Sequence, residues 1–232
     1  MTGKQRYDQF CPVASALDII GNRWALLVLR ELTLGPRRFK DIHLGLETAS
    51  TDMVAARLRE LTEAGLVERL EDRRYQLTAA GDALAPVSRA LLIWSYQVTF
   101  RNTIAEGTTI PSTGLPRRVL NILGCFTRTT PPRSVNTPTS LVIGDLRAVL
   151  LPQGVGYKIL EGTNPDATGT ITFEPNAFVE FGVGLSTAAE LRATDRLHLS
   201  GDEAELVLKD IEAVLQSVWA EIAEFPMSAT VG

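Results

Sequence analysis

The sequence predicts an α+β protein of two domains, and three observations support this prediction. The chain has 232 residues, enough for two ordinary domains with separate cores. Apolar residues recur with a helical period in residues 1–100, whereas short apolar runs separated by glycine-containing turns dominate 139–232. Residues 101–138 are rich in Thr, Pro, Gly and Asn, as linkers are. We therefore expect two domains, 1–100 and 139–232, and a linker at 101–138 with a short helix near 119–126.

The overall composition indicates an ordinary globular protein. Hydrophobic residues make up 45% of the chain and charged residues 22%, and no segment approaches the roughly 20 apolar residues of a membrane span. The start, MTGKQRYDQF, lacks an apolar signal core, so we expect a cytoplasmic protein without membrane contact. Cys11 and Cys125 are the only cysteines, too few for a disulfide framework or a zinc site.

The charge distribution gives only weak support for nucleic-acid binding. The net charge is −4, which by itself argues against it. The first 100 residues, however, carry 13 basic and 12 acidic residues, whereas the remainder carries 10 and 15. The positions of the arginines must therefore decide the question.

Two helices are expected at the start of the chain, at Pro12–Ile20 and Trp24–Leu34, with a break at Gly21-Asn22. The second helix reads WALLVLREL and is apolar on nearly all sides. We therefore expect it to lie in the core of the first domain, and Gly35-Pro36 to end it.

The segment that organises the first domain is a predicted helix at Thr51–Ala64. Its apolar residues Val54, Leu58 and Leu61 follow helical spacing, so one face is buried and the opposite face stays free to enter a groove. Gly65 is expected to end this helix.

A shorter helix is expected before it, because Phe39, Ile42 and Leu46 are spaced by three and four. Two helices joined by the turn 45–50 have helix-turn-helix geometry, in which the second helix enters the major groove. The residues at 66–70 and 75–77 alternate as in two short strands, and the charged Glu71-Asp72-Arg73-Arg74 lies between them as a tight turn. Two such strands and their turn form a wing.

A long helix is expected to follow the wing, from Thr78 as the N-cap through Trp94. Pro86 lies inside it and should kink it. Its apolar stripe includes Leu91 and Trp94 and has no partner within a small domain. We expect a two-fold dimer contact through this helix and the first helix of the chain to cover the stripe.

The first domain resembles the HxlR-type family of bacterial winged-helix transcription regulators over residues 10–97. The resemblance rests on CPVASALDIIGNRWALLVLRELTLGPRRFKDI, on the Leu-Arg-Glu-Leu-x-x-x-Gly-Leu-Val run at 58–67 and on YQLTAAGDAL. It implies a homodimer that binds pseudo-palindromic operator DNA and regulates a neighbouring gene. Asp52 stands where family members often carry a basic or amide residue.

The residues expected to contact double-stranded DNA lie ahead of the 51–64 helix, at its start, on its exposed face and at the wing tip. They are Arg37, Arg38, Lys40, Ser50, Thr51, Asp52, Arg57, Arg59, Arg73 and Arg74. Arginine suits this role because its planar fork matches guanine edges and phosphates. Two alternatives stay open: Arg57 and Arg59 could pair with nearby glutamates, and Ser50 could simply cap the helix.

The second domain is predicted to combine a sheet with helices. Strands are expected at Leu141–Ile143, Ala148–Leu151, Tyr157–Leu160, Thr170–Phe173 and 197–201. Helices are expected at 175–184, at 187–193 and from Asp202 to about Phe225, where Pro226 ends the last one.

This order resembles the sterol carrier protein type two fold, best in TITFEPNAFVEF and DRLHLSGDEAELVLKDIEAVL. The resemblance implies an apolar tunnel for a fatty-acyl or similar ligand. Its candidate lining residues are Phe173, Phe178, Phe181, Leu206, Ile211 and Leu215. The alternative is that these residues simply fill the core.

Cys11 is a further candidate site, because some HxlR-type members use a cysteine at this position as a thiol sensor. Cys11 precedes a predicted helix, whose N-terminus can lower the pKa of a thiol, but a buried structural cysteine is the alternative. His43 and His198 show no metal-ligand spacing.

The sequence contains no phosphate loop, nucleophile elbow or paired carboxylates, so we expect neither a cofactor nor catalysis. It predicts a homodimeric, DNA-binding transcription regulator that responds to an apolar small molecule. The alternative is a carrier of an apolar ligand that uses its winged domain to dimerise.

Overall fold

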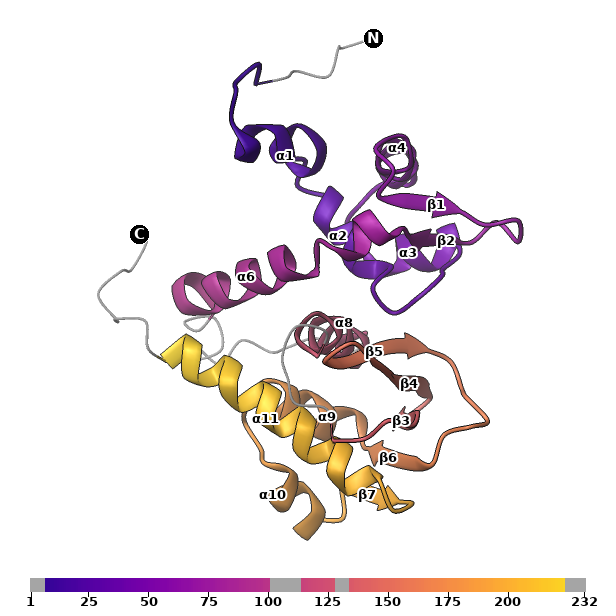
Figure 1. The fold of residues 1–232 in the computed structure, drawn as a ribbon, viewed down its shortest axis with the longest axis vertical. Helices are drawn as coiled ribbons and strands as arrows, with labels where there is room; N and C mark the ends of the chain where they lie inside the picture. The colour runs from indigo at the N-terminus through magenta and orange to yellow at the C-terminus, as the bar shows by residue number, and fades with distance from the viewer. Residues whose placement is uncertain (1–6, 101–113, 128–133, 224–232) are drawn as a thin grey trace. The chain divides into compact units, whose positions relative to one another are not determined.

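The computed structural model describes residues 7–100, 114–127 and 134–223. It divides into two compact units, one up to Leu84 and one from Ala85 onward (Figure 1). The first unit consists of helices and a two-stranded sheet, and the second contains a five-stranded sheet with helices, which confirms the α+β class. This division between the two units lies before residue 100, the expected end of the first domain. The expected domain bounds, 1–100 and 139–232, stay predictions.

Four helices form the body of the first unit. They are α1 (Pro12–Ile20), α2 (Ala25–Glu31), α3 (Phe39–Gly45) and α4 (Thr51–Glu63). The apolar faces of the last three meet in one core, where Val28, Ile42 and Val54 are completely buried. In the described residues no single helix is both long and apolar enough to cross a membrane; α1 and α2 pass that test only together, across a 69° bend.

Helix α4 forms where its apolar period predicts it. Val54, Leu58 and Leu61 are at most 1% exposed. The Ser50 hydroxyl accepts a hydrogen bond from the Met53 N–H at 3.3 Å, so Ser50 is the N-cap. Gly65 follows the helix with a φ of +71°, which glycine adopts without strain.

The wing consists of β1 (Val67–Arg69) and β2 (Tyr75–Leu77), which pair antiparallel with Val67 opposite Leu77. The segment ahead of α3 joins this sheet through Arg37. The backbone N–H of Arg37 donates to the Tyr75 carbonyl at 2.9 Å, and the Tyr75 N–H donates to the Arg37 carbonyl at 2.7 Å. The wing is therefore attached to the helix-turn-helix by backbone bonds as well as by the chain.

The long helix predicted from Thr78 through Trp94 is wrong, because the structure has two helices here. Thr78 caps the short α5 (Ala79–Asp82), and its hydroxyl accepts from the Gly81 N–H at 3.2 Å. A second helix, α6 (Ala85–Ser95), then begins with Pro86 at its second position and continues into the π-helix η1 (Tyr96–Phe100). A proline in the first turn loses no helical hydrogen bond, so Pro86 starts a helix instead of kinking one.

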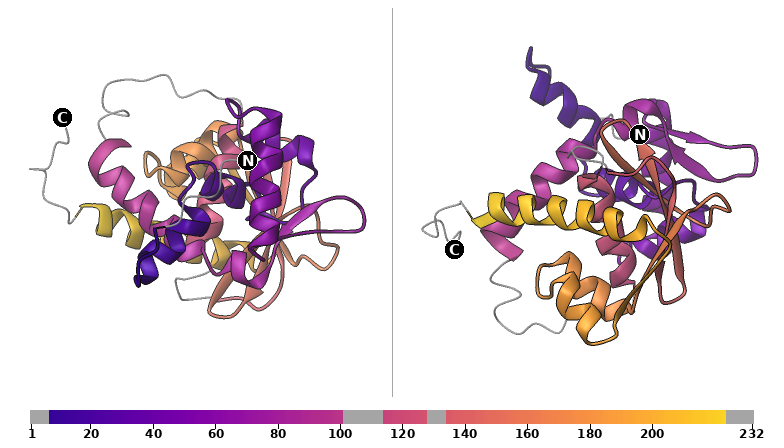
Figure 2. Two further views of the ribbon diagram at one scale, coloured as in Figure 1. Left: turned by 90° about the horizontal axis from the view of Figure 1, so that it is seen from above. Right: turned by 60° about the horizontal axis from the view of Figure 1, so that its bottom comes forward.

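The five-stranded sheet of the second unit has the order β5-β4-β3-β6-β7. Its strands are labelled in Figure 1, and Figure 2 shows the ribbon from two further sides. Its strands are β3 (Thr139–Ile143), β4 (Leu146–Gln153), β5 (Gly156–Glu161), β6 (Gly169–Phe173) and β7 (Leu197–Ser200). Only the central pair of β3 and β6 is parallel, with Leu141 opposite Ile171. All five strands occur where the sequence predicts them.

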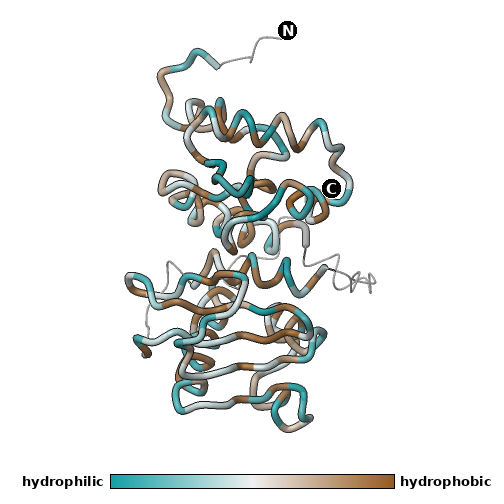
Figure 3. Tube along the Cα trace, turned by 90° about the vertical axis from the view of Figure 1, so that its right-hand side faces the viewer, coloured by the Kyte–Doolittle hydropathy of each residue, from teal (hydrophilic) through white to brown (hydrophobic). Residues whose placement is uncertain are grey.

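Four helices accompany this sheet: α8 (Leu115–Phe126), α9 (Pro175–Gly182), α10 (Ala188–Ala193) and α11 (Ala204–Ala223). Burial alternates along β3 and β6, so alternate side chains of each strand enter the core, and hydrophobic positions recur along the strands in Figure 3. Helix α8 is the short helix expected inside the linker. The end predicted for the last helix, Phe225-Pro226, lies outside the described residues.

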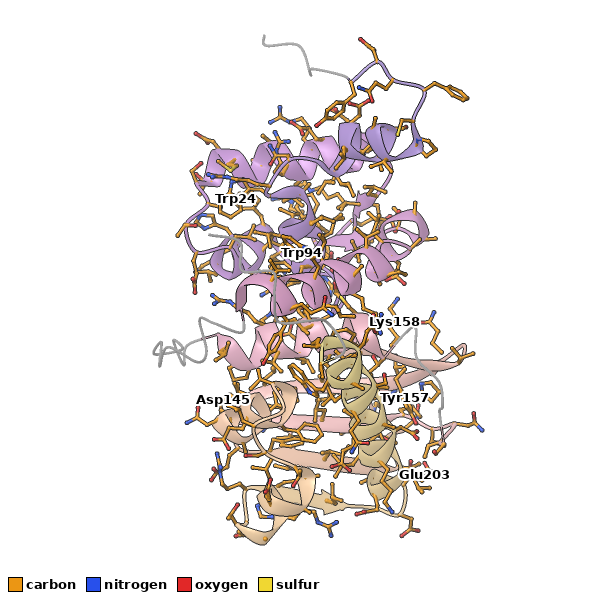
Figure 4. The ribbon with its side chains drawn as sticks, turned by 90° about the vertical axis from the view of Figure 1, so that its left-hand side faces the viewer. Trp24, Trp94, Asp145, Tyr157, Lys158 and Glu203 are labelled. Carbon is orange, nitrogen blue, oxygen red and sulfur yellow. The ribbon has the colours of Figure 1, made fainter. Side chains whose placement is uncertain are left out.

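A buried carboxylate ties α11 to the sheet. Asp210 is 5% exposed and accepts a hydrogen bond from the hydroxyl of Tyr157 on β5 at 2.6 Å (Figure 4 labels Tyr157). It also accepts bonds from the backbone N–H and the hydroxyl of Ser134, both at 2.6 Å. The charge is thus satisfied in the interior by three donors.

A partly exposed ion pair ties α9 to the turn before β7. The guanidinium of Arg196 donates to both carboxylate oxygens of Glu180, at 2.9 and 2.8 Å, and to Glu174 at 3.2 Å. The hydrogen bond from Arg196 is the main reason that the pKa of Glu180 lies below its ordinary value.

We expect Glu180→Gln to lower the free energy of unfolding by about 0.5–1 kcal/mol at neutral pH, the range of partly exposed ion pairs. The pKa of Glu180 is lowered in the folded state, so its contribution is complete above the ordinary value of 4.5 and is lost as pH falls through the folded value. Urea unfolding of the two proteins should therefore converge in acid below pH 4.5. The exposed Asp145→Asn serves as control, and a difference that persists unchanged in acid contradicts the assignment.

Candidate nucleic-acid interface

A buried ion pair holds the helix-turn-helix and its wing together. Glu31, the last residue of α2, is 1% exposed and accepts from the guanidinium of Arg37 at 2.5 Å and from that of Arg30 at 2.9 Å. The Arg37 side chain is itself only 10% exposed. Arg37 was expected to contact phosphate, but the structure places it in the framework of the unit instead.

The turn between α3 and α4 passes directly over this ion pair. A Cβ atom at Gly45 would lie 2.1 Å from the Glu31 carboxylate oxygen Oε2, so any larger residue there would force the buried carboxylate to move. Glycine at position 45 therefore lets the turn approach the charge. Glu31 was not among the predicted site residues, although a lone acid inside the apolar run WALLVLREL is a visible signal in the sequence.

The two arginines of α4 differ in what surrounds them. The guanidinium of Arg57 is 19% exposed and bonds to both carboxylate oxygens of Glu60, with Nη2 to Oε1 at 2.6 Å. This is the pairing alternative that the sequence left open. Arg59 is exposed, as are Asp52 and Glu63, which share its face of the helix by spacing. Within the described residues Arg59 forms no ion pair, so it stays available to an external partner.

The start of α4 has a structural role that is now visible. Ser50 caps the helix, which is the second alternative. Thr51 and Asp52 lie exposed in the first turn, where a carboxylate is favoured by the helix dipole. Among the described residues neither the Thr51 hydroxyl nor the Asp52 carboxylate has a hydrogen-bond partner, so both are free at this end of the helix.

The remaining predicted basic residues are exposed at the start of α3 and at the wing tip. Arg38 and Lys40 are exposed, and so is Arg73, whose φ of +67° forms the wing turn. Arg74 instead donates from Nε to Asp72 at 2.6 Å. Its backbone N–H is the main cause, and its side chain the second, of the lowered pKa of Asp72. In the described part of the chain Arg38, Lys40 and Arg73 have no ion-pair partner.

Several exposed apolar side chains lie together on one helix of each unit. In the first unit they are Phe10, Val13, Leu17 and Ile19, on or next to α1. In the second unit they are Val87, Leu91 and Trp94 on α6, and Trp94, labelled in Figure 4, is 55% exposed. Cys11 is the half-buried N-cap residue of α1 and is a free thiol, and its role as a sensor stays a prediction.

The aromatic residues predicted to line a ligand tunnel pack against one another. The ring centroid of Phe173 lies 5.4 Å from that of Phe178 and 5.2 Å from that of Phe181, and all three side chains are buried. Ile211 and Leu215 are buried as well, whereas Leu206 is 43% exposed. Of the six, Phe181 and Leu215 line a pocket with a volume of about 190 Å³.

The sequence model of one protein family, the HxlR-like helix-turn-helix proteins, matches residues 19–102 of this chain. The HTH-type transcriptional regulator YodB of Bacillus subtilis is 37% identical over 94 residues, which cover 38% of this chain and 84% of YodB. An HTH-type transcriptional regulator of Synechocystis is 37% identical over 87 residues (35% of this chain), and one of Mycobacterium bovis is 38% identical over 90 residues (35%). The chain spans 64% and 55% of those two relatives' lengths.

Solved structures also match this chain, and one example is given for each of the two parts of the fold. The crystal structure of quinone-bound YodB from B. subtilis is 39% identical and covers 38% of this chain and 98% of its own, with a TM-score of 0.36. The solution structure of palmitated SCP2L2, a sterol carrier-like protein of Aedes aegypti, is 16% identical. It covers 44% of this chain and 93% of its own, with a TM-score of 0.37.

Because Arg37 neutralises a buried carboxylate, we expect Arg37→Ala to lower the free energy of unfolding by about 3 kcal/mol. The neighbouring Arg38 is exposed, so Arg38→Ala should change it by less than about 0.5 kcal/mol. Urea unfolding of the full chain, followed by circular dichroism, measures both. Equal stability of the two variants would show that the Glu31 pair is not a structural element.

Proposed function

The chain belongs to the HxlR-like helix-turn-helix family, and from this premise we propose that it is a transcription regulator that binds double-stranded DNA as a homodimer. The observation that carries the proposal is the pair α3 and α4 with the wing β1–β2, in the segment where its relatives are HTH-type transcriptional regulators. In this arrangement α4 is the helix that enters the major groove.

Base contacts in this proposal come from the exposed face of α4. Arg59 has a free guanidinium there and can donate two hydrogen bonds to a guanine edge. Thr51 lies at the N-terminus of the helix, where a hydroxyl and backbone N–H groups suit a phosphate. Asp52 and Glu63 share the face of Arg59, so a phosphate close to them would be repelled. Recognition should therefore depend strongly on Arg59.

Phosphate contacts in this proposal come from the two sides of α4. Arg38 and Lys40 lie at the start of α3, and Arg73 lies at the wing tip, each exposed and available for a backbone phosphate. Arg74 would first have to leave Asp72, with which it is paired at 2.6 Å. Because the net charge of the chain is −4, these few positions must supply the attraction.

The exposed apolar faces of α1 and α6 are the surfaces that a second copy of the chain would cover. A two-fold dimer of this kind presents two α4 helices and therefore fits a pseudo-palindromic operator. Cys11 at the start of α1 lies beside the first of these faces, so a change at its thiol would act on the dimer contact.

We further propose that a small apolar molecule bound to the second unit modulates DNA binding. A ligand changes an equilibrium only through a difference in its affinity for two states, so it would have to favour one spacing of the two α4 helices. The linker expected to transmit this difference, 108–116, lies largely outside the described residues. The proposed role is cytoplasmic and non-catalytic, with no cofactor.

A DNase footprint of the purified chain on its own upstream region tests the proposal, at physiological salt and with competitor DNA. Two protected half-sites about one helical turn apart support a dimeric regulator. Binding that vanishes as salt rises, without a footprint, would favour the alternative function of an apolar-ligand carrier that uses its winged unit to dimerise.

On the protected site, Arg59→Ala should weaken binding by about 10- to 100-fold, the effect of one lost guanine contact. Arg57→Ala is the matched control on the same helix, because Glu60 already occupies its guanidinium. We expect its effect on the binding free energy to stay below about 0.5 kcal/mol. Fluorescence anisotropy with labelled duplex measures both affinities. Equal losses for the two variants would contradict the proposed orientation of α4.

Neutralising the wing tip with Arg73→Gln and Arg74→Gln together should weaken binding to operator and scrambled duplex alike. Each lost phosphate contact should also flatten the slope of log K against log salt by about 0.9. Glu71→Gln, a neighbouring wing variant that removes a negative charge, should not flatten it. An unchanged slope in the double variant would remove the wing from the DNA interface.

A further inference from the structure

A pocket of about 190 Å³ opens between α11 and the segment that connects α9 to α10. Its buried lining consists of Phe181 and Leu215, and the half-buried indole of Trp219 forms a wall beside them. The connecting segment approaches that indole closely, since a Cβ atom at Gly184 would lie 3.0 Å from the ring. The volume is of the order that holds one aromatic ring or a short alkyl chain.

The exposed lining of the same pocket is acidic. Glu190 and Glu212 border it, and in the described residues no lysine or arginine does. The basic residues nearest along the chain, Arg192 and Lys209, both pair with Glu205, at 2.8 and 3.7 Å. The pocket therefore combines an apolar interior with two uncompensated negative charges.

In each of the two carboxylates, one oxygen accepts hydrogen bonds from the protein. Glu190 Oε2 accepts from the backbone N–H and the hydroxyl of Thr187, at 2.8 and 2.9 Å, and completes a capping box. Glu212 Oε1 accepts from the backbone N–H of Ala188 at 3.3 Å. The other oxygen of each group has no hydrogen-bond partner in the described part of the chain. Each glutamate is thus positioned by the protein and still has an acceptor for a ligand.

The backbone and hydroxyl donors of Thr187 lower the pKa of Glu190, so this carboxylate is charged at neutral pH. An anionic head group, such as a fatty-acyl carboxylate, would meet like charge at this opening. A cation would meet two carboxylates and the indole ring of Trp219, an aromatic system of the kind that attracts cations.

We propose that this pocket binds amphipathic amines, with the apolar part against Phe181, Leu215 and Trp219 and the ammonium group between Glu190 and Glu212. The proposal deepens the ligand-binding part of the function proposed above and names the chemical class of the ligand. It does not depend on DNA binding, because it concerns the second unit alone.

Isothermal titration of the full chain with three probes of equal chain length tests it: octylammonium, octanoate and 1-octanol. We expect octylammonium to bind at least ten-fold more tightly than octanoate. The double variant Glu190→Gln with Glu212→Gln should abolish this preference, because glutamine keeps both the capping box and the bond from Ala188 but not the charge. Asp145→Asn, which removes an exposed negative charge outside the pocket, should keep it.

A second variant locates the site independently. Leu185 borders the pocket and is 64% exposed, so Leu185→Arg adds a cation at the opening without disturbing the core. It should weaken octylammonium and strengthen octanoate. If 1-octanol binds and the two charged probes bind equally, an apolar ligand site remains and the amine proposal is overturned. If none of the probes binds, both are overturned, while a footprint on DNA would still stand.

Discussion

The first unit depends on one buried charge. Glu31 lies at the end of α2 with 1% of its surface exposed, and a carboxylate in that position must be paired or it destabilises the fold. Arg37 supplies the pairing charge and also joins the backbone of the wing through Tyr75. Gly45 lets the turn of the helix-turn-helix pass over the same carboxylate. One ion pair therefore sets the positions of α2, of the turn and of the wing relative to one another.

A division of labour among arginines follows from this arrangement. The sequence places them in close pairs, and in each pair the structure uses one member internally and leaves the other exposed. Arg37, Arg57 and Arg74 bond to acids of the same unit, whereas Arg38, Arg59 and Arg73 have no such partner among the described residues. The paired members stabilise the elements, and the exposed members are the ones that a nucleic acid can reach. In a chain with net charge −4, this division leaves Arg38, Arg59 and Arg73 as exposed cations.

The second unit separates its apolar interior from its opening in a similar way. The three phenylalanines of the predicted tunnel fill the core between the sheet and α9, and Asp210 fastens α11 to β5. The opening of the pocket lies farther along α11, where Leu215 and Trp219 line it together with Glu190 and Glu212. The charge at this opening comes from Glu190 and Glu212, which lie on two different helices.

The sequence by itself determined the elements that depend on local periodicity and local capping. These include α4 with its Ser50 cap, the wing, and all five strands of the second unit. Only the tertiary structure decided which charges are paired. It also decided that a second helix, α6, begins with Pro86 in its first turn. It further decided that Leu206 is exposed, whereas Leu215 lines a pocket. The physical reason is range. A hydrophobic stripe or a cap involves residues within one or two turns, but the partner of Arg37 and the surroundings of Glu212 are set by how distant segments pack.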